Sequence, residues 1–197
     1  AYETGAFSYT ANPVFTDSSM HPDIAYRYIN TEGDSTHHAM INLFGFALGY
    51  SWYASAYSLA DSSLHKSDTS IISINRGLLL GGVLGFGIGY SAGFSDTEGF
   101  DGYRGWNFGL LFRPFSFVSF GASFRDIAGE LDGSGLKPIH AYSVALRPFG
   151  EWLTLSADYT TRSAYSDDPS WSFSGSVSMW QNASLFLCGD TSRNFTA

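Results

Sequence analysis

The residues of this chain that could carry chemistry are few and scattered. Metal binding needs several converging ligands, and the adjacent pair His37-His38 would point to opposite faces of a strand. The single Cys188, among histidines dispersed along the chain, does not indicate a nucleophile with its base. Neither Lys66 nor Lys137 lies in a catalytic motif. We therefore expect a non-enzymatic protein with no catalytic residue, no metal ion and no cofactor.

Two other patterns invite a chemical interpretation. Asp96, Glu98 and Asp101 offer oxygen ligands for calcium, although an ordinary solvated loop has the same composition. The run Gly85-Phe86-Gly87-Ile88-Gly89 is superficially similar to a dinucleotide-binding loop. It lies within a predicted strand and no predicted helix follows, so strand curvature explains it better.

Composition points to an all-β chain. Of 197 residues, 17 % are aromatic, 22 are glycine and only 14 % are charged, which favours strands over helices. No stretch approaches the ~20 apolar residues of a membrane helix, which leaves a membrane barrel open. The net charge of -8 provides no basic patch for nucleic acid. The opening residues lack the features of a signal peptide, so the chain is either mature and trimmed or cytosolic, and we expect the first.

Alternation at a period of two is the strongest structural signal. Large apolar residues alternate with small or polar ones through the hairpin 102–126, and eleven such segments follow one another: 23–31, 39–47, 49–58, 69–78, 83–93, 102–112, 117–126, 140–146, 151–161, 170–180 and 183–190. Most have the ~9–11 residues of a tilted strand that crosses a bilayer. Because bacterial barrels are usually even-numbered, we expect about 12 strands, within 10 to 14. The missing strand would lie near 4–11 or in a longer polypeptide.

The connections alternate between short and long. Short turns are predicted at 79–82, 113–116, 147–150 and 181–182, and long polar loops at 59–68, 94–101, 127–139 and 162–169. This is the pattern of an up-and-down outer-membrane barrel with periplasmic turns. The predicted periplasmic turns contain Arg113, Pro114, Arg147 and Pro148. Residues predicted at the membrane interface are the tryptophans Trp52, Trp106, Trp152 and Trp171.

The small face of the strands predicts a narrow or occupied interior. Glycine and serine alternate along 85–91, 119–123 and 172–178 and would face inward. The N-terminal segment 1–20 could plug this interior, while 21–197 would form the barrel. Four inward-facing polar residues could form a lumen network, or lie as satisfied charges at the rim: Asn75, Asn107, Arg125 and Asp158.

Two copies of a strand, Arg-Pro turn, strand unit carry a family resemblance. The stretches 102–126 and 145–159 resemble small bacterial outer-membrane barrels related to the fatty-acid transporter and to the type IX secretion shuttle-protein family, and most closely those fused to signal-peptide-peptidase-type proteases. Ala11-Asn12-Pro13 is similar to an early Asn-Pro-Ala motif of the group. The resemblance implies a barrel in the bacterial outer membrane, surrounded by lipid.

Three functions remain open at this point. The first is a barrel that anchors or docks a periplasmic or surface protein in the outer membrane. The second is a transporter for hydrophobic small molecules, in which the N-terminal plug moves. The third is a soluble β-sandwich binding domain. The peptidase's Ser and Lys machinery has no counterpart in the sequence, and nucleic acid is not an expected partner.

Overall fold

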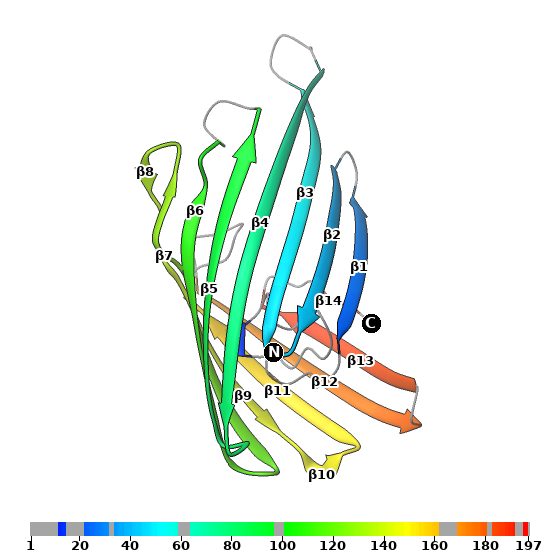
Figure 1. Cartoon of the computed structure of the whole chain (residues 1–197). Helices are drawn as coiled ribbons and strands as arrows, with labels where there is room; N and C mark the ends of the chain where they lie inside the picture. Colours follow the sequence, from blue (N-terminus) through cyan, green and yellow to red (C-terminus); the bar gives the residue numbers. More distant parts are fainter. Residues whose placement is uncertain are drawn as a thin grey trace.

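The protein is one antiparallel sheet in which each long strand pairs with its neighbour in the chain (Figure 1). The computed structural model describes residues 12–14, 22–31, 34–58, 64–96, 101–161, 169–180, 183–191 and 195–196. Eleven strands have eight residues or more: β1 (Asp23–Thr31), β2 (Asp34–Leu43), β3 (Phe46–Ser58), β4 (Leu64–Leu80), β5 (Leu84–Ser95), β6 (Arg104–Phe115), β7 (Val118–Leu131), β9 (Ile139–Leu146), β11 (Leu153–Thr160), β12 (Ser170–Trp180) and β13 (Ala183–Asp190). Three short strands complete the set: β8 (Ser134–Gly135), β10 (Pro148–Glu151) and β14 (Phe195–Thr196).

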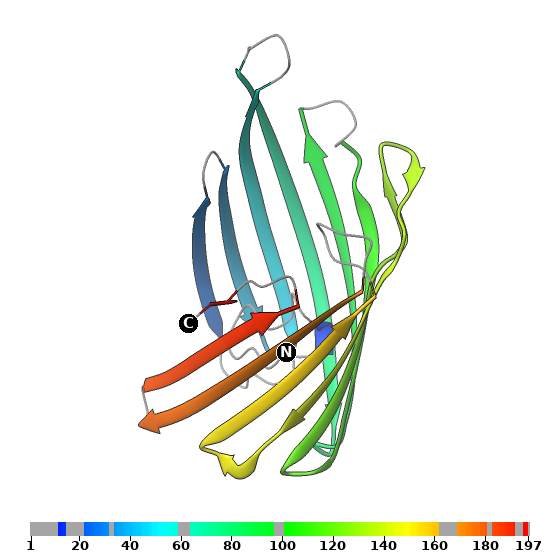
Figure 2. The ribbon, with the colours of Figure 1, turned by 180° about the vertical axis from the view of Figure 1, so that it is seen from behind.

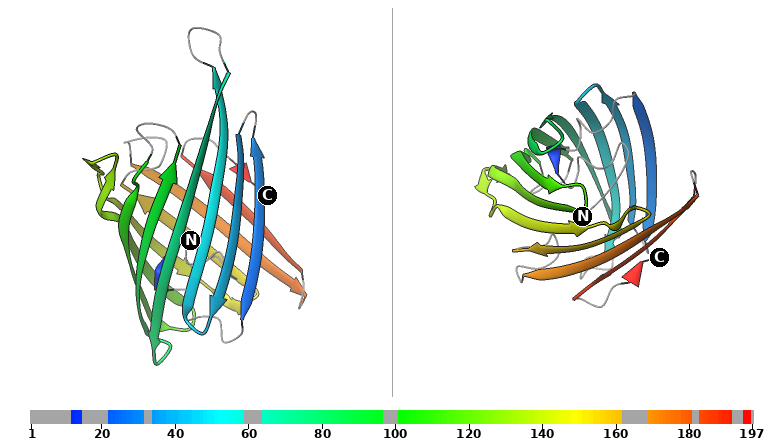
Figure 3. Two further views of the ribbon diagram at one scale, coloured as in Figure 1. Left: turned by 45° about the horizontal axis from the view of Figure 1, so that its top comes forward. Right: turned by 90° about the horizontal axis from the view of Figure 1, so that it is seen from below.

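The sheet is strongly curved and does not close in the described residues. Viewed from behind, β9 to β13 cross at a steep angle to β1 to β5 (Figure 2), and the end-on view shows the curve that they complete together (Figure 3, right). In the described part of the chain no pairing joins β1 to β14. The all-β, antiparallel, up-and-down prediction is confirmed, and eleven long strands fall within the expected range, whereas closure into a barrel stays a prediction.

Tight turns determine where several strands end. At the β2–β3 turn Phe44 and Gly45 have φ of 49° and 86°, and at the β7–β8 turn Asp132 and Gly133 have 48° and 72°. Positive φ at both central residues is the geometry of a two-residue hairpin turn that matches strand twist. The β2–β3 turn corrects the prediction of strands 39–47 and 49–58. An aromatic residue at a positive φ carries no turn signal in the sequence, so the prediction places the turn too late.

Strand β7 corrects a second prediction, that of a long loop at 127–139. The strand continues to Leu131 through two bulges in its pairing with β6. Asp126 and Ala128 adopt positive φ of 57° and 49° in this bulged stretch. A bulge inserts an extra residue and reverses the in–out alternation beyond it. The period-two pattern is lost at that point although the strand continues.

The predicted turn at 113–116 begins too early. Arg113 and Pro114 belong to the last residues of β6, where the β6–β7 register shifts between Phe112 and Phe115, and the turn follows at 116–117. Proline is tolerated there because it lies at a strand end with irregular pairing. The loops expected at 59–68 and 94–101 are also shorter, since β4 starts at Leu64 and β5 ends at Ser95. Residues 1–11, including the strand suggested near 4–11, lie outside the described residues.

Candidate functional site

The two faces of the sheet have opposite chemistry, and the concave face holds most of the buried polar groups. Buried polar side chains outnumber buried apolar ones in the described residues: Asn12, Asn42, Asn75, Ser91, Ser119, Ser123, Arg147, Thr154 and Ser156 against Val14, Met40, Ala47, Leu111, Ile139 and Ala145. Among the described residues 35 large apolar or aromatic side chains are exposed, Ile24 at 76 % among them, and most of those in strands lie on the convex face. The arrangement is the reverse of a water-soluble sheet, whose apolar face is covered.

The N-terminal segment 12–14 is seated inside the curve of the sheet (Figure 3, right). Asn12 holds it there, because its Nδ2 donates hydrogen bonds to the carbonyl oxygens of Leu110 and Ala122, each at 3.1 Å. Its Oδ1 accepts a bond from the backbone N–H of Val14 at 3.1 Å. Val14 is buried against Leu111 and Leu79. One asparagine therefore ties the segment to two adjacent strands and also fixes the turn that it forms.

Glycines make the room for this segment. Gly87 of β5 and Gly109 of β6 are paired across the sheet. A Cβ atom on Gly87 would lie 2.8 Å from the Cβ of Pro13, and one on Gly109 would lie 2.9 Å from the Cγ of Asn12, both closer than real side chains approach. Gly85 would collide with Val14 in the same way. Gly85 and Gly87, part of the run interpreted in the sequence as strand curvature, thus form the seat of segment 12–14 together with Gly109.

A second polar cluster lies at the long-loop end of the same face. The Tyr103 hydroxyl donates to Oδ1 of Asp126 at 2.6 Å, and Oδ1 of Asn107 accepts from the backbone N–H of Asp126 at 3.4 Å. Nδ2 of Asn107 donates to the Ser91 hydroxyl at 3.3 Å. The cluster spans β5, β6 and β7 at the bulge, where Gly105 leaves space for the Asp126 side chain. Its geometry stabilises the positive φ of Asp126.

The electrostatics of this cluster favour a protonated phenol. Burial raises the pKa of Tyr103 well above its ordinary value, and the hydrogen bond to Asp126 and the negative charge of that carboxylate raise it further. The positive charge of Arg125 opposes the effect only in part. Tyr103 therefore acts as a hydrogen-bond donor to the carboxylate over the physiological pH range.

The four residues predicted for the lumen lie on four strands, β4, β6, β7 and β11. Asn107 joins the Tyr103–Asp126 cluster, whereas Asn75 is buried on β4 and Asp158 on β11 lies in register with Ser143 and Ser172. Within the described residues no hydrogen bond connects Asn75, Asn107 and Arg125 to one another. The sequence analysis missed the contact between Tyr103 and Asp126, because they are 23 positions apart and meet at a bulge.

Arg113, Pro114, Arg147 and Pro148 lie at the short-turn end of the sheet, with Arg113 and Pro114 among the last, turn-proximal residues of β6. The backbone N–H of Arg113 donates to the carbonyl of Val83 at 2.7 Å, and that of Arg147 donates to Phe117 at 2.8 Å. Each arginine thus connects its strand to the turn of the neighbouring hairpin. The Arg147 side chain is buried, while Pro148 is exposed at the start of β10.

Aromatic side chains form two levels on the convex face. Near the long loops Trp106 contacts Tyr90 and Trp171 contacts Tyr159, each pair with ring centroids 4.9 Å apart, and Trp52 stacks on His37 at 4.2 Å. We call these residues the upper girdle. The lower girdle, near the short turns, includes Phe115 and Phe117 at 5.3 Å, and Phe149 and Trp152 at 6.1 Å. All four tryptophans predicted for an interface therefore lie in one girdle or the other.

The spacing of the girdles follows from strand geometry. Phe115 lies nine positions after Trp106 on β6, and at about 3.3 Å per position this is roughly 30 Å along the strand. A tilt of about 35–45° reduces the height to roughly 21–25 Å, close to the ~25 Å apolar band of outer-membrane barrels. Leucine, isoleucine and phenylalanine fill the interval on β5 and β6.

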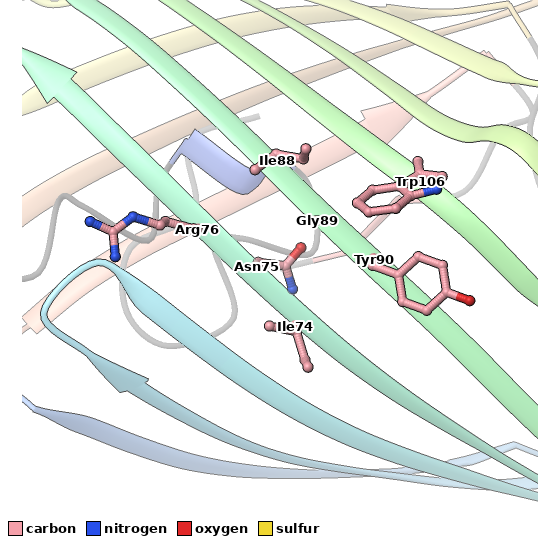
Figure 4. A pocket seen from close by; sticks show the side chains of 7 residues that line it. All are labelled: Ile74, Asn75, Arg76, Ile88, Gly89, Tyr90 and Trp106. Atoms are coloured by element: carbon pink, nitrogen blue, oxygen red, sulfur yellow. The ribbon is translucent and has the colours of Figure 1, made fainter.

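One charge interrupts this interval. Arg76 of β4 lies between the exposed residues Ile74 and Leu78, and the close view shows it beside Ile88 of the next strand (Figure 4). The sequence analysis did not single it out, although it breaks the run Ile72, Ile74, Leu78, Leu80 at an outward-facing position. That break was the available signal.

Comparison with known proteins identifies no relative. The sequence matches no protein-family model and has no significant similarity to any curated protein. Within the described ranges the structure contains no helix with the length and apolar character of a membrane span. In the same ranges no three His, Cys, Asp or Glu side chains come together as metal ligands. The resemblance carried by the Arg-Pro units remains an expectation.

Proposed function

We propose that this chain forms a β-barrel of the bacterial outer membrane that anchors or docks a partner protein, without enzymatic activity. The observation that carries the membrane assignment is the reversed polarity of the sheet. Exposed apolar and aromatic residues cover its convex face, while Asn42, Asn75 and Thr154 are buried on the other side. Such a face is stable in contact with lipid, whereas exposing it to water costs a free energy of about 25 cal/mol per Å² of apolar surface.

The topology supports the same proposal over a soluble β-sandwich. The strands pair in chain order, without the crossovers that carry a sandwich from one sheet to the other. A sandwich buries its alternating apolar residues between two sheets, but here those residues are on the outside of the curve. In the proposal the edges β1 and β13–β14 are joined in the membrane-inserted state.

The occupied interior supports anchoring over passive diffusion. Segment 12–14 fills the concave side of β5 and β6, where Asn12 and the glycine seat hold it. A wide porin channel needs an unobstructed, polar lumen. The proposal therefore assigns the barrel a closed lumen and a role in holding another protein at the membrane.

Two measurements test this function. The refolded chain should insert into phospholipid vesicles, show heat-dependent mobility on a gel and carry no ion current across a planar bilayer. In the native cell, deletion of the chain should move a specific protein from the outer-membrane fraction to the soluble fraction. Failure to insert into vesicles refutes the membrane assignment. Insertion with no protein changing fraction refutes the anchoring role.

A second candidate is transport of hydrophobic small molecules, favoured by the way segment 12–14 is held. Two side-chain hydrogen bonds and one buried valine can be released without breaking the sheet. A disulfide between cysteines introduced in place of Val14 and Leu111, which pack against each other, in a chain with Cys188→Ser, would lock the segment on its seat. A transporter should lose uptake of a fatty-acid probe when locked and recover it on reduction. An anchor should retain its partner protein whether the disulfide is formed or reduced.

A further inference from the structure

Arg76 is the one Lys, Arg, Asp or Glu on the convex face between the two girdles, among the residues that the structure describes. Its cross-strand neighbours on that face are Phe46 of β3 and Ile88 of β5. The guanidinium carbon lies 4.1 Å from the centroid of the Phe46 ring. No described residue offers it a hydrogen bond or an ion pair. Arg104, the other outward-facing arginine, is bound to the carboxylate of Glu130.

The position of Arg76 suggests which part of a membrane it faces. Phe46 closes the β2–β3 turn, and the backbone N–H of Gly77 donates to the carbonyl of Gly45 in that turn at 3.2 Å. The close view shows the Arg76 side chain extending away from Trp106 toward the turn of the cyan hairpin (Figure 4). A charged side chain is least unfavourable near the interface and most unfavourable at the midplane. On the other side of Arg76, Ile88 is in register with Phe108, two residues from Trp106 of the upper girdle, so Arg76 lies between the two girdles.

Two apolar hollows flank Arg76 on the convex face. One, of about 420 Å³, is lined by the side chains of Ile74, Ile88, Tyr90 and Trp106. The other, of about 400 Å³, is lined by Leu78, Phe86, Ile88, Phe108 and Leu110, and the backbone of three glycines forms its floor. Both fall within the size range of small-ligand sites. They provide apolar surface on each side of a single cation.

We propose that Arg76 and these two hollows bind one glycerophospholipid. The guanidinium holds the phosphate, and the acyl chains lie in the hollows. The inference rests on the membrane assignment above and adds a specific lipid site to it. Charge complementarity selects a phosphate, which arginine binds through paired N–H donors. The first hollow exposes carbon almost exclusively and the second is predominantly apolar, which suits acyl chains better than a peptide with its many hydrogen-bonding groups.

The test compares lipid binding by the full chain and its variants, refolded in detergent and measured by native mass spectrometry. The probes are phosphatidylglycerol and phosphatidylcholine. Wild type should bind phosphatidylglycerol about tenfold or more tightly than Arg76→Gln, the factor expected for loss of a charge-assisted contact. The affinity of Arg76→Lys should lie between those of wild type and Arg76→Gln, since lysine keeps the positive charge and loses the paired N–H donors of the guanidinium. Arg104→Gln, the matched control on the same face, should bind as wild type does.

A further variant tests the hollows independently of the charge. Ile88→Trp fills both hollows and leaves Arg76 in place, so it should also weaken lipid binding. Leu155→Trp makes the same addition to the convex face of β11 and should have no effect. Equal binding by wild type and Arg76→Gln would overturn the site, and equal binding by Ile88→Trp would overturn the acyl positions. A chain that never inserts into vesicles would instead refute the membrane assignment itself.

Discussion

A single methyl group at Gly87 should expel the N-terminal segment from the sheet. The Cβ of Gly87→Ala would overlap the backbone of Pro13 and Val14, which cannot rotate away as a side-chain tip could. Gly87 pairs with Gly109 in the middle of β5 and β6, so the strands themselves have little freedom to separate. The segment is the part that must move.

The magnitude follows from what holds the segment. Asn12 makes two hydrogen bonds to strand carbonyls, each contributing about 1 kcal/mol, and burial of Val14 contributes about 1.5–3 kcal/mol. The seat is therefore stabilised by roughly 4 kcal/mol. Loss of this stabilisation raises the population of the displaced segment by about 10²- to 10³-fold.

The assay measures the accessibility of residue 14. A cysteine introduced in place of Val14, in a chain with Cys188→Ser, should react slowly with a water-soluble maleimide because the site is only 2 % exposed. Adding Gly87→Ala should accelerate labelling by about two to three orders of magnitude. Gly175→Ala is the matched control, since its Cβ would meet only Leu155 at an ordinary 3.6 Å.

The refuting result is specific. If Gly87→Ala leaves the labelling rate unchanged while the heat-dependent mobility of the folded chain is retained, segment 12–14 does not occupy the glycine seat. Misfolding could not produce this result, because unfolding exposes residue 14 and would accelerate labelling.

Three further predictions concern other parts of the chain. Asn12→Ala should accelerate labelling of the cysteine introduced at position 14 by about 30-fold, less than Gly87→Ala, because it removes about 2 kcal/mol of hydrogen bonding and leaves the apolar contacts of the segment; equal rates for both variants would contradict this. Leu110→Arg on the convex face should lower the free energy of unfolding from vesicles by about 2–4 kcal/mol in a urea titration, and an unchanged midpoint would mean that lipid does not cover this face. The raised pKa of Tyr103 should stabilise the fold fully below the unfolded tyrosine pKa of about 10 and progressively less as the pH rises above it, so Tyr103→Phe should flatten the decline of the urea midpoint above pH 10.

Much of the fold could be predicted because strand alternation is local. Period-two spacing separates Phe108 and Leu110 from Gly109 wherever the strand lies, so both faces were recognisable in advance. Strand ends were harder to predict. The turn at Phe44-Gly45 depends on an aromatic residue with a positive φ, and the continuation of β7 depends on bulges at Asp126 and Ala128. Neither the positive φ at Phe44 nor the bulges are marked by the residue types that usually indicate a turn.

The candidate site was less predictable because its parts are distant in the chain. Asn12 binds carbonyls 98 and 110 positions away, and no local pattern specifies which strand pair receives it. The same holds for Tyr103 and Asp126, which meet only because a bulge brings their strands into that register. Arg76 was visible as a break in alternation, but the hollows beside it depend on three aligned strands.

The sequence by itself therefore determined the class of fold and the chemistry of each face, since these depend on neighbours two residues apart. Tertiary structure alone decided that glycines 85, 87 and 109 receive segment 12–14, and that Arg76 lies over Phe46 between two apolar hollows. The physical reason is the distance along the chain over which each feature is determined. A side chain's face is set by the covalent geometry of its own strand, whereas its partner is set by strand register and sheet curvature, which arise only when the whole sheet has formed.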